Sequence, residues 1–463
     1  MRIPLFLLHA TAFVLCMLLE GKSAFAVSAV AMIVSLGLNL YRPPSFLRLI
    51  MFWQLGFLFM VCREGILFAE SISQAIGDQL YSAAAVYLCA ANSAVLLGWT
   101  VAFDSHRKID GRPGGSGYNM QARIAPTALV VAAYLFAVAV LGPKALAAAD
   151  EGRSAALIGQ SLSIADRLLP AFAETAAMAI PPLIAFVLIH FYPRVRGKAP
   201  VTLLLSLPIF LIQALIGSRF PLLFSFAGMT VVLLSTQVFS IRLLSKLCVA
   251  GLVLFVAASV IGAIRDRGLR GSSEVIGAYF DSNPVMHSEG VVQLTGQIID
   301  HYEGNPYLLG RSSASVLVFW VPRALWPEKP TLLGYWFIRE YKPNTYFNPL
   351  HSASASFAGD AYVDFGFAGG LVLLFLVGLG FGRLDRWTAS VVATRGHPML
   401  PFVATLYPAT FFAVRSLNTA LITLCGVSVV VFAFMITIRR RHGSYGIPAQ
   451  PSWSVSRLSV SEE

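Results

Sequence analysis

Long apolar runs alternate with short polar connections along most of the chain. An α-helix needs about 20 apolar residues to cross the hydrocarbon core of a bilayer, because each residue adds only about 1.5 Å of length. We expect about twelve such helices, at 3–19, 24–41, 46–69, 78–103, 125–142, 169–192, 201–217, 220–238, 247–264, 366–382, 399–415 and 418–438. Since backbone polar groups in lipid must be satisfied within the segment, the pattern predicts an all-α polytopic membrane protein.

The positive charges between these runs predict how the chain is oriented. Cytoplasmic connections of membrane proteins are enriched in Lys and Arg. Counted along the predicted spans, the basic clusters fall on one side, at 42–48, 104–124, 193–200, 242–246, 383–395 and 439–441. The connection 70–77 contains no Lys or Arg and falls on the other side. We therefore expect both termini in the cytoplasm, including a tail over 439–463 whose polar composition predicts disorder.

Two segments of the N-terminal half allow a second interpretation. Residues 1–26 also resemble a signal peptide, with Arg2, an apolar core and then small residues, but the charge pattern is consistent only if this span is retained. The segment 201–238 is either one long helix or two short spans that turn at Gly217-Ser218-Arg219. The charge pattern requires two spans.

Composition agrees with a lipid environment. Of the 463 residues, 57% are hydrophobic and 12% are charged, whereas soluble domains carry roughly 25% charged residues. The net charge of +11 lies in short clusters between spans, so we do not expect nucleic acid as a partner. The five cysteines lie inside apolar runs without a CxxC motif, and we expect no disulfide framework, metal site or cofactor.

One long polar region interrupts the spans. It divides the chain into N-terminal helices over 1–264, a loop over 265–365 and C-terminal helices over 366–438. The charge count places the loop outside the cytoplasm, in the periplasm. We expect a short helix over 312–321 and a longer one over 285–303 that begins after Asn283 and Pro284. The apolar face of the longer helix comprises Val291, Val292, Leu294, Ile298 and Ile299.

Aromatic and basic side chains are concentrated in this loop. Aromatic rings among charges suit either a membrane interface or a carbohydrate, and composition does not separate the two. The basic residues are Arg265, Arg267, Arg270, Arg311, Arg323, Lys329, Arg339 and Lys342. The guanidinium fork matches phosphate oxygens, while pairing with the loop's own carboxylates is the alternative.

Three motifs resemble the Wzy-type oligosaccharide repeat-unit polymerases. The sequence VPRALWPEKP at 321–330 is similar to the family signature P-R-x-x-W-P-x-K-P, and FAGDAYVDFG at 357–366 is similar to G-E-x-Y-x-N-F-G. Gly217-Ser218-Arg219 resembles the G-S-R turn of the same family. Asp360 and Asp364 depart from the pattern, because they stand where the family commonly has Glu and Asn.

The resemblance implies a GT-C-like fold and a glycosyltransferase of the bacterial inner membrane. Such polymerases move a growing glycan from undecaprenyl pyrophosphate onto an incoming lipid-linked repeat unit, for O-antigen or exopolysaccharide. The implied partners are this lipid-linked oligosaccharide, membrane lipid and a chain-length regulator. The alternative enzyme is the related O-antigen ligase. The non-enzyme alternative is a polysaccharide transporter or flippase, which the absence of an internal repeat disfavours.

The proposed transfer requires two kinds of side chain. The acceptor hydroxyl must lose a proton, for which His351 and Asp360 are the candidate bases. The departing pyrophosphate must be stabilised by cationic groups, for which the candidates are Arg219, Arg265, Arg267, Arg323 and Lys329.

Other residues have weaker assignments. Trp326 and Tyr362 are the candidate sugar contacts, because each lies in a family-like motif and carries an amphipathic ring. Arg219, Arg265 and Arg267 can alternatively serve as anchors at the membrane interface. Arg63 and Glu64, adjacent within the third predicted span, need partners there, and both a structural and a carrier-facing role stay open.

Overall fold

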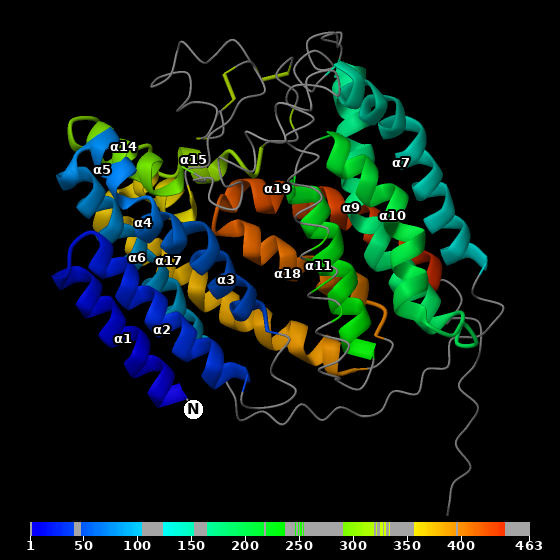
Figure 1. Ribbon diagram of the computed structural model, residues 1–463, viewed down its shortest axis with the longest axis horizontal. Coiled ribbons are helices and arrows are strands. Elements are labelled where there is room, and N and C mark those ends of the chain that lie inside the picture. Colours follow the sequence, from blue (N-terminus) through cyan, green and yellow to red (C-terminus); the bar gives the residue numbers. More distant parts are fainter. Residues whose placement is uncertain are drawn as a thin grey trace, which may run out of the picture.

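The computed structural model describes residues 2–40, 48–103, 124–151, 164–216, 219–236, 290–318, 356–394 and 397–439, and single positions at 246–253 and 321–333. Every element in this part of the chain is a helix (Figure 1). The elements are α1 (Arg2–Leu18), α2 (Lys22–Leu40), α3 (Leu49–Phe57), the π-helix η1 (Leu58–Cys62), α4 (Arg63–Leu67), α5 (Ala69–Ile76), α6 (Asp78–Ala102), α7 (Ile124–Glu151), α9 (Ile164–His190), α10 (Lys198–Ile216), α11 (Arg219–Thr236), α14 (Val291–Glu303), α15 (Arg311–Ala314), α17 (Ser356–Ala393), α18 (Leu400–Ala413) and α19 (Leu417–Arg439).

Eight of the described helical segments are long and apolar enough to cross a membrane. They are α2, the continuous run from α3 to α4, α6, α7, α9, α10, α17 and α19. Three further apolar helices, α1, α11 and α18, are shorter and coincide with predicted spans. The predicted span at 247–264 lies almost entirely outside the described residues. The described part of the chain is therefore all-helical and compatible with a polytopic membrane protein, while the number of twelve spans and the GT-C-like fold stay predictions.

The segment 201–238 contains two helices that fold back on each other. Gln213 Nε2 lies 3.0 Å from Ser225 Oγ, and the rings of Phe210 and Phe226 lie 6.2 Å apart. In one continuous helix, the 12 residues from 213 to 225 would span about 18 Å. The segment therefore forms two helices rather than one, and their crossing of the membrane as two spans stays a prediction.

The loop helices gather at one end of the bundle, together with α5 (Figure 1); we call this the loop end. All five residues of the predicted apolar face of α14 are buried against the bundle. The predicted start of this helix is wrong, because it begins at Val291, after Gly290 adopts a left-handed conformation with φ 71° that ends a right-handed helix. The second loop helix is also shorter than predicted, since α15 is a single turn.

Among the described helices, α6 and α17 make the most extensive contact, and glycines allow their backbones to touch. A Cβ atom at Gly378 would overlap the backbone of Val95, and one at Gly98 would overlap the backbone of Phe375. Gly382, one turn beyond Gly378, meets Trp99 and Ala102 in the same way. Small residues four apart are typical of helices that associate in lipid through backbone contact.

Three buried carboxylates accept hydrogen bonds from the first turn of a helix. Glu64 Oε1 accepts from the N–H of Val292 in α14 at 3.0 Å. Asp385 accepts from the N–H of Leu49 in α3 at 2.8 Å and from the indole of Trp99 at 3.0 Å. These carboxylates supply acceptors to N–H groups that a helix cannot satisfy internally.

Asp364 is the third of these carboxylates, and it holds the loop to α17. It accepts from the N–H groups of Ser312 and Ser313 at 2.9 and 2.8 Å and from the Ser313 hydroxyl at 2.6 Å. Beside it, the N–H groups of Leu308 and Leu309 donate to the carbonyl oxygens of Val363 and Asp364. The departure from the family pattern at this position therefore has a structural account.

We expect Gly378→Leu to destabilise the protein, because the added side chain has to separate α6 from α17. Overpacking costs about 1–3 kcal/mol, so the melting temperature in detergent should fall by about 1–3 °C for a chain of this length. Gly380→Leu is the matched control, since no atom lies within 4 Å of a Cβ at Gly380. Equal melting temperatures for the two variants would contradict this account of the α6–α17 contact.

We expect Asp364→Ala to release the segment 305–318 from α17. Two buried N–H groups and a hydroxyl would lose their acceptor, at about 1–3 kcal/mol for each unsatisfied group. Hydrogen exchange measured by mass spectrometry should accelerate about tenfold or more in this segment. Asp364→Asn, which introduces the residue common at this position in the family that the motif resembles and keeps one acceptor oxygen, should give an intermediate rate. Unchanged exchange in the alanine variant would refute the role of Asp364.

Candidate functional site

A row of four phenylalanine rings crosses the loop end from η1 to α11. The rings of Phe59 and Phe411 lie 6.4 Å apart, those of Phe411 and Phe412 lie 5.1 Å apart, and those of Phe412 and Phe220 lie 3.6 Å apart. We call these four residues the phenylalanine row. It connects three helical segments that are far apart in the sequence, at the end of α18.

Arginines stand next to this row on each of the three segments. The guanidinium carbon of Arg63 lies 4.6 Å from the centre of the Phe59 ring, a cation–π distance. Arg415 follows Phe411 by one turn, just past the end of α18, where its N–H donates to the carbonyl oxygen of Phe412. Arg219 is the first residue of α11 and directly precedes Phe220. The fold therefore brings three arginine positions to one place.

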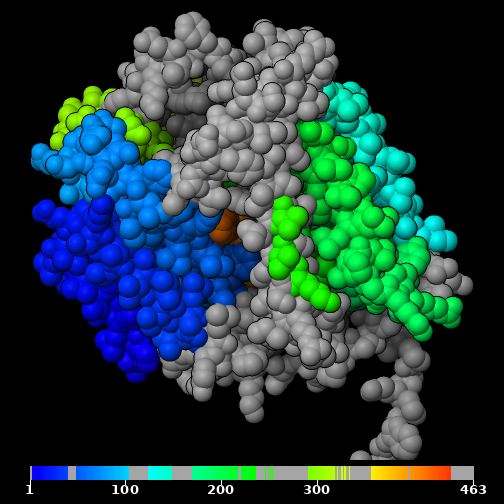
Figure 2. Space-filling model, in the orientation of Figure 1, coloured from blue at the N-terminus to red at the C-terminus, as the bar shows by residue number. Residues whose placement is uncertain are grey.

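Two of the three arginines are partly shielded from solvent, close to the C-terminal helices. In Figure 2, orange atoms of these helices are visible beside the blue atoms of α3 and α4. Arg63 and Arg415 are both half-buried. Half-buried guanidinium groups on aromatic rings are suited to an anionic group attached to an apolar chain.

Asp360 lies close to the same end of α18, in the first turns of α17. The N–H of Phe357 donates to the carbonyl oxygen of Val414 at 3.3 Å, which joins the start of α17 to the residue before Arg415. Asp360 is only 5% exposed and lies within reach of the backbone N–H of Asn418, in the first turn of α19. Among the described residues, Asp360 Oδ2 and Asn418 Nδ2 have no hydrogen-bond partner. A buried carboxyl group with an unused oxygen is a suitable proton acceptor.

Tyr362 is placed on the other side of the same helix. Two residues correspond to about 200° of rotation around a helix, so Tyr362 faces away from Asp360. Its ring contacts those of Tyr87 at 5.0 Å and Tyr307 at 6.1 Å. Helix α17 bends just after this turn, at Gly366 with φ 69°, where the Tyr307 ring occupies the place of a side chain.

Of the remaining predicted residues, Trp326 and Lys329 are described by the structure, and the others lie outside the described part of the chain. Trp326 is 41% exposed. Lys329 donates from Nζ to the carbonyl oxygen of Val321 at 2.7 Å, within its own motif. The candidate base His351 and the candidate cations Arg265, Arg267 and Arg323 lie outside the described residues.

The structure also brings together residues that the sequence alone does not assign to the site. For Arg63 the sequence leaves a structural and a carrier-facing role open, Arg415 lies near the predicted outer face without being a pyrophosphate candidate, and Asn418 carries no signal. A signal for the two arginines exists, because each follows a phenylalanine by four residues at one end of a predicted span, Phe59–Arg63 and Phe411–Arg415. Residues four apart on a helix lie on one face.

Comparisons with known proteins add no assignment to this site. No family model matches the chain, and no curated protein and no solved structure matches it.

Proposed function

We propose that this chain is a membrane glycosyltransferase that polymerises lipid-linked oligosaccharide repeat units. It transfers the growing glycan from undecaprenyl pyrophosphate to an incoming lipid-linked unit, at the outer face of a bacterial inner membrane with both termini in the cytoplasm. The observation that carries the proposal is the meeting of Arg63, Arg415 and the start of α11 around the phenylalanine row, beside the buried Asp360. The three family-like motifs support the same reaction.

The chemistry of the donor matches this arrangement. A polyprenyl pyrophosphate joins an apolar chain to a group with several phosphate oxygens. Phenylalanine rings contact the apolar chain, while guanidinium groups donate paired hydrogen bonds to phosphate oxygens. An arginine near the interface keeps its charge accessible to water and headgroups, which limits the energetic cost of placing it there.

The transfer itself breaks one bond and forms one. The acceptor hydroxyl oxygen attacks the anomeric carbon of the donor sugar, and the bond from that carbon to the pyrophosphate oxygen breaks. The hydroxyl proton passes to Asp360 or His351, and the electron pair leaves with the pyrophosphate. The arginines stabilise the charge that develops on this leaving group.

We expect Arg63→Ala, Arg219→Ala and Arg415→Ala to shorten the surface glycan severely. Removing one preorganised charge contact typically slows a reaction by about 10²-fold or more. The measurement is the chain-length ladder of surface polysaccharide in a deletion strain complemented with each variant, with the protein level followed by immunoblot. Arg383→Ala is the matched control, because Arg383 is exposed and lies at the far end of α17.

The same ladder separates the alternatives. Loss of a polymerase leaves single repeat units on the surface, whereas loss of a ligase leaves an undecorated core and long lipid-linked chains. An unchanged distribution of glycan chain lengths in the three arginine variants would show that these residues do not act in the transfer. A full ladder in the deletion strain itself would overturn the proposed function.

Asp360 provides a second test of the proposal. Asp360→Asn keeps the shape of the side chain but removes the proton acceptor, so we expect only single repeat units at a normal protein level. Asp360→Glu, which introduces the family's usual residue, should retain long chains. Full-length glycan from the asparagine variant would leave His351 as the remaining candidate base.

A further inference from the structure

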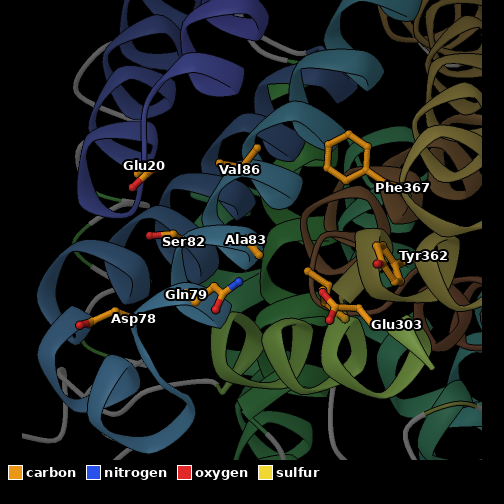
Figure 3. Close-up of a pocket in the computed structure, with 10 residues that line it drawn as sticks. Glu20, Asp78, Gln79, Ser82, Ala83, Val86, Glu303, Tyr362 and Phe367 are labelled. Atoms are coloured by element: carbon orange, nitrogen blue, oxygen red, sulfur yellow. The ribbon is translucent and has the colours of Figure 1, made fainter. Parts of the chain in front are cut away.

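A cavity of about 610 Å³ lies at the loop end on the opposite side of the α17 start from Asp360. It is open to the surface and is lined by residues at the end of α1, the first turns of α6, the end of α14 and the bend of α17 (Figure 3). Its size is in the range typical of small-ligand sites, about 300–1,000 Å³. None of the residues already placed around the phenylalanine row lines it.

The lining of the cavity is divided into an acidic rim and an apolar floor. Exposed carboxyl groups come from three helical segments, with Glu20 after α1, Asp78 at the start of α6 and Glu303 at the end of α14 (Figure 3). The floor includes Ile299 and the rings of Tyr362 and Phe367. None of the described residues that line the cavity is basic, although the whole chain carries a net charge of +11.

The geometry points to a carbohydrate-binding subsite that prefers neutral or amino sugars and rejects acidic ones. The assignment of a sugar rests on the proposed function, while the charge preference follows from the cavity itself. An apolar sugar face stacks on the partly exposed ring of Phe367, beside the buried ring of Tyr362. Sugar hydroxyl and ammonium groups donate to the rim carboxylates, and hydrogen bonds with charged groups are the stronger kind.

The position of the cavity gives this subsite a place in the proposed reaction. Tyr362, in its floor, and Asp360 occupy opposite faces of one helical turn, so the cavity lies about one helix diameter, roughly 10 Å, from the buried carboxyl group. The rim carboxylates repel phosphate and uronate groups. The pyrophosphate therefore binds at the arginines, and the sugars beyond the reacting unit occupy the cavity.

The rim is held in place by the surrounding helices. The Ser73 hydroxyl donates to Asp78, and Glu303 ends a helix whose apolar face is buried on the bundle. Because the carboxyl groups are exposed, substituting them does not leave a buried gap. Gln variants of the rim glutamates therefore test binding without a large effect on folding.

The test uses the full-length protein in lipid nanodiscs with three tetrasaccharide probes of the same length. These are a glucosamine tetramer with free amines, its neutral N-acetylated form and an anionic galacturonic acid tetramer. Calorimetry should give the tightest binding for the amine probe and no binding for the anionic one. In the double variant Glu20→Gln/Glu303→Gln, binding of the amine probe should weaken about tenfold and that of the neutral probe only slightly.

Two further variants complete the experiment. Phe367→Leu should weaken the amine and neutral probes alike, because it removes a stacking surface. Glu70→Gln is the matched control, since Glu70 is an exposed carboxylate of α5 outside the cavity lining, 3.8 Å from Lys22, and it should change nothing. Binding by a variant is interpreted only if that variant elutes as a single species in size-exclusion chromatography.

The outcomes separate this inference from the proposed function. Equal binding of the three probes, or binding that the rim and floor variants leave unchanged, would overturn the subsite. Charge-selective binding that responds to the variants supports it, whatever the glycan ladder of the deletion strain shows. A ladder that is lost in the arginine variants but full in the cavity variants, together with no probe binding, would refute the subsite and leave the polymerase assignment standing.

Discussion

The interaction on which this structure depends most is the hydrogen bond from the start of a helix to a buried carboxylate. Glu64, Asp364 and Asp385 each accept such bonds, for α14, α15 and α3 respectively. Burying an unpaired helix N–H group or an unpaired carboxylate away from water costs free energy. A hydrogen bond between the two offsets both costs. The positive end of the helix dipole adds to the attraction. Two of these contacts attach the loop to the spans, and the third attaches α3 to α6 and α17.

These hydrogen bonds fix the positions of the helices around the phenylalanine row and around the cavity. The bond from Val292 to Glu64 attaches α14 to α4, and Glu303 at the end of α14 lines the cavity. Glu64 is adjacent to Arg63, whose guanidinium lies over Phe59. The same short helix, α4, therefore supports both the cavity and the phenylalanine row. Arg63 and Glu64 are adjacent charged residues inside a predicted span, which looks unfavourable in the sequence. Arg63 contacts the phenylalanine row, and Glu64 binds α14, which lines the cavity.

The sequence was sufficient to predict the features that depend on local periodicity and failed for those that depend on long-range contacts. Apolar length gave the helices, and the 3.6-residue repeat gave the buried face of α14. The start of α14 was predicted at the good capping pair Asn283-Pro284, but the left-handed Gly290 sets it at Val291. The partner of Glu64 lies 228 residues away, and no local pattern encodes that distance. Arg219 and Asp360 were selected by motif, whereas the contacts of α18 that link their segments came from the fold.

The opposite charges of the two sites explain how a single helical turn can orient a long substrate. On the proposed function, the substrate has an anionic pyrophosphate at one end and a glycan along the rest of its length. Arginines around the phenylalanine row attract the first part, and the carboxylates of the cavity repel it. The acidic rim accepts hydrogen bonds from hydroxyl and ammonium groups, whereas the arginines are donors only and cannot pair with an ammonium group. Since Asp360 and Tyr362 lie on opposite faces of α17, a substrate that satisfies both sites passes the buried carboxyl group in one direction only.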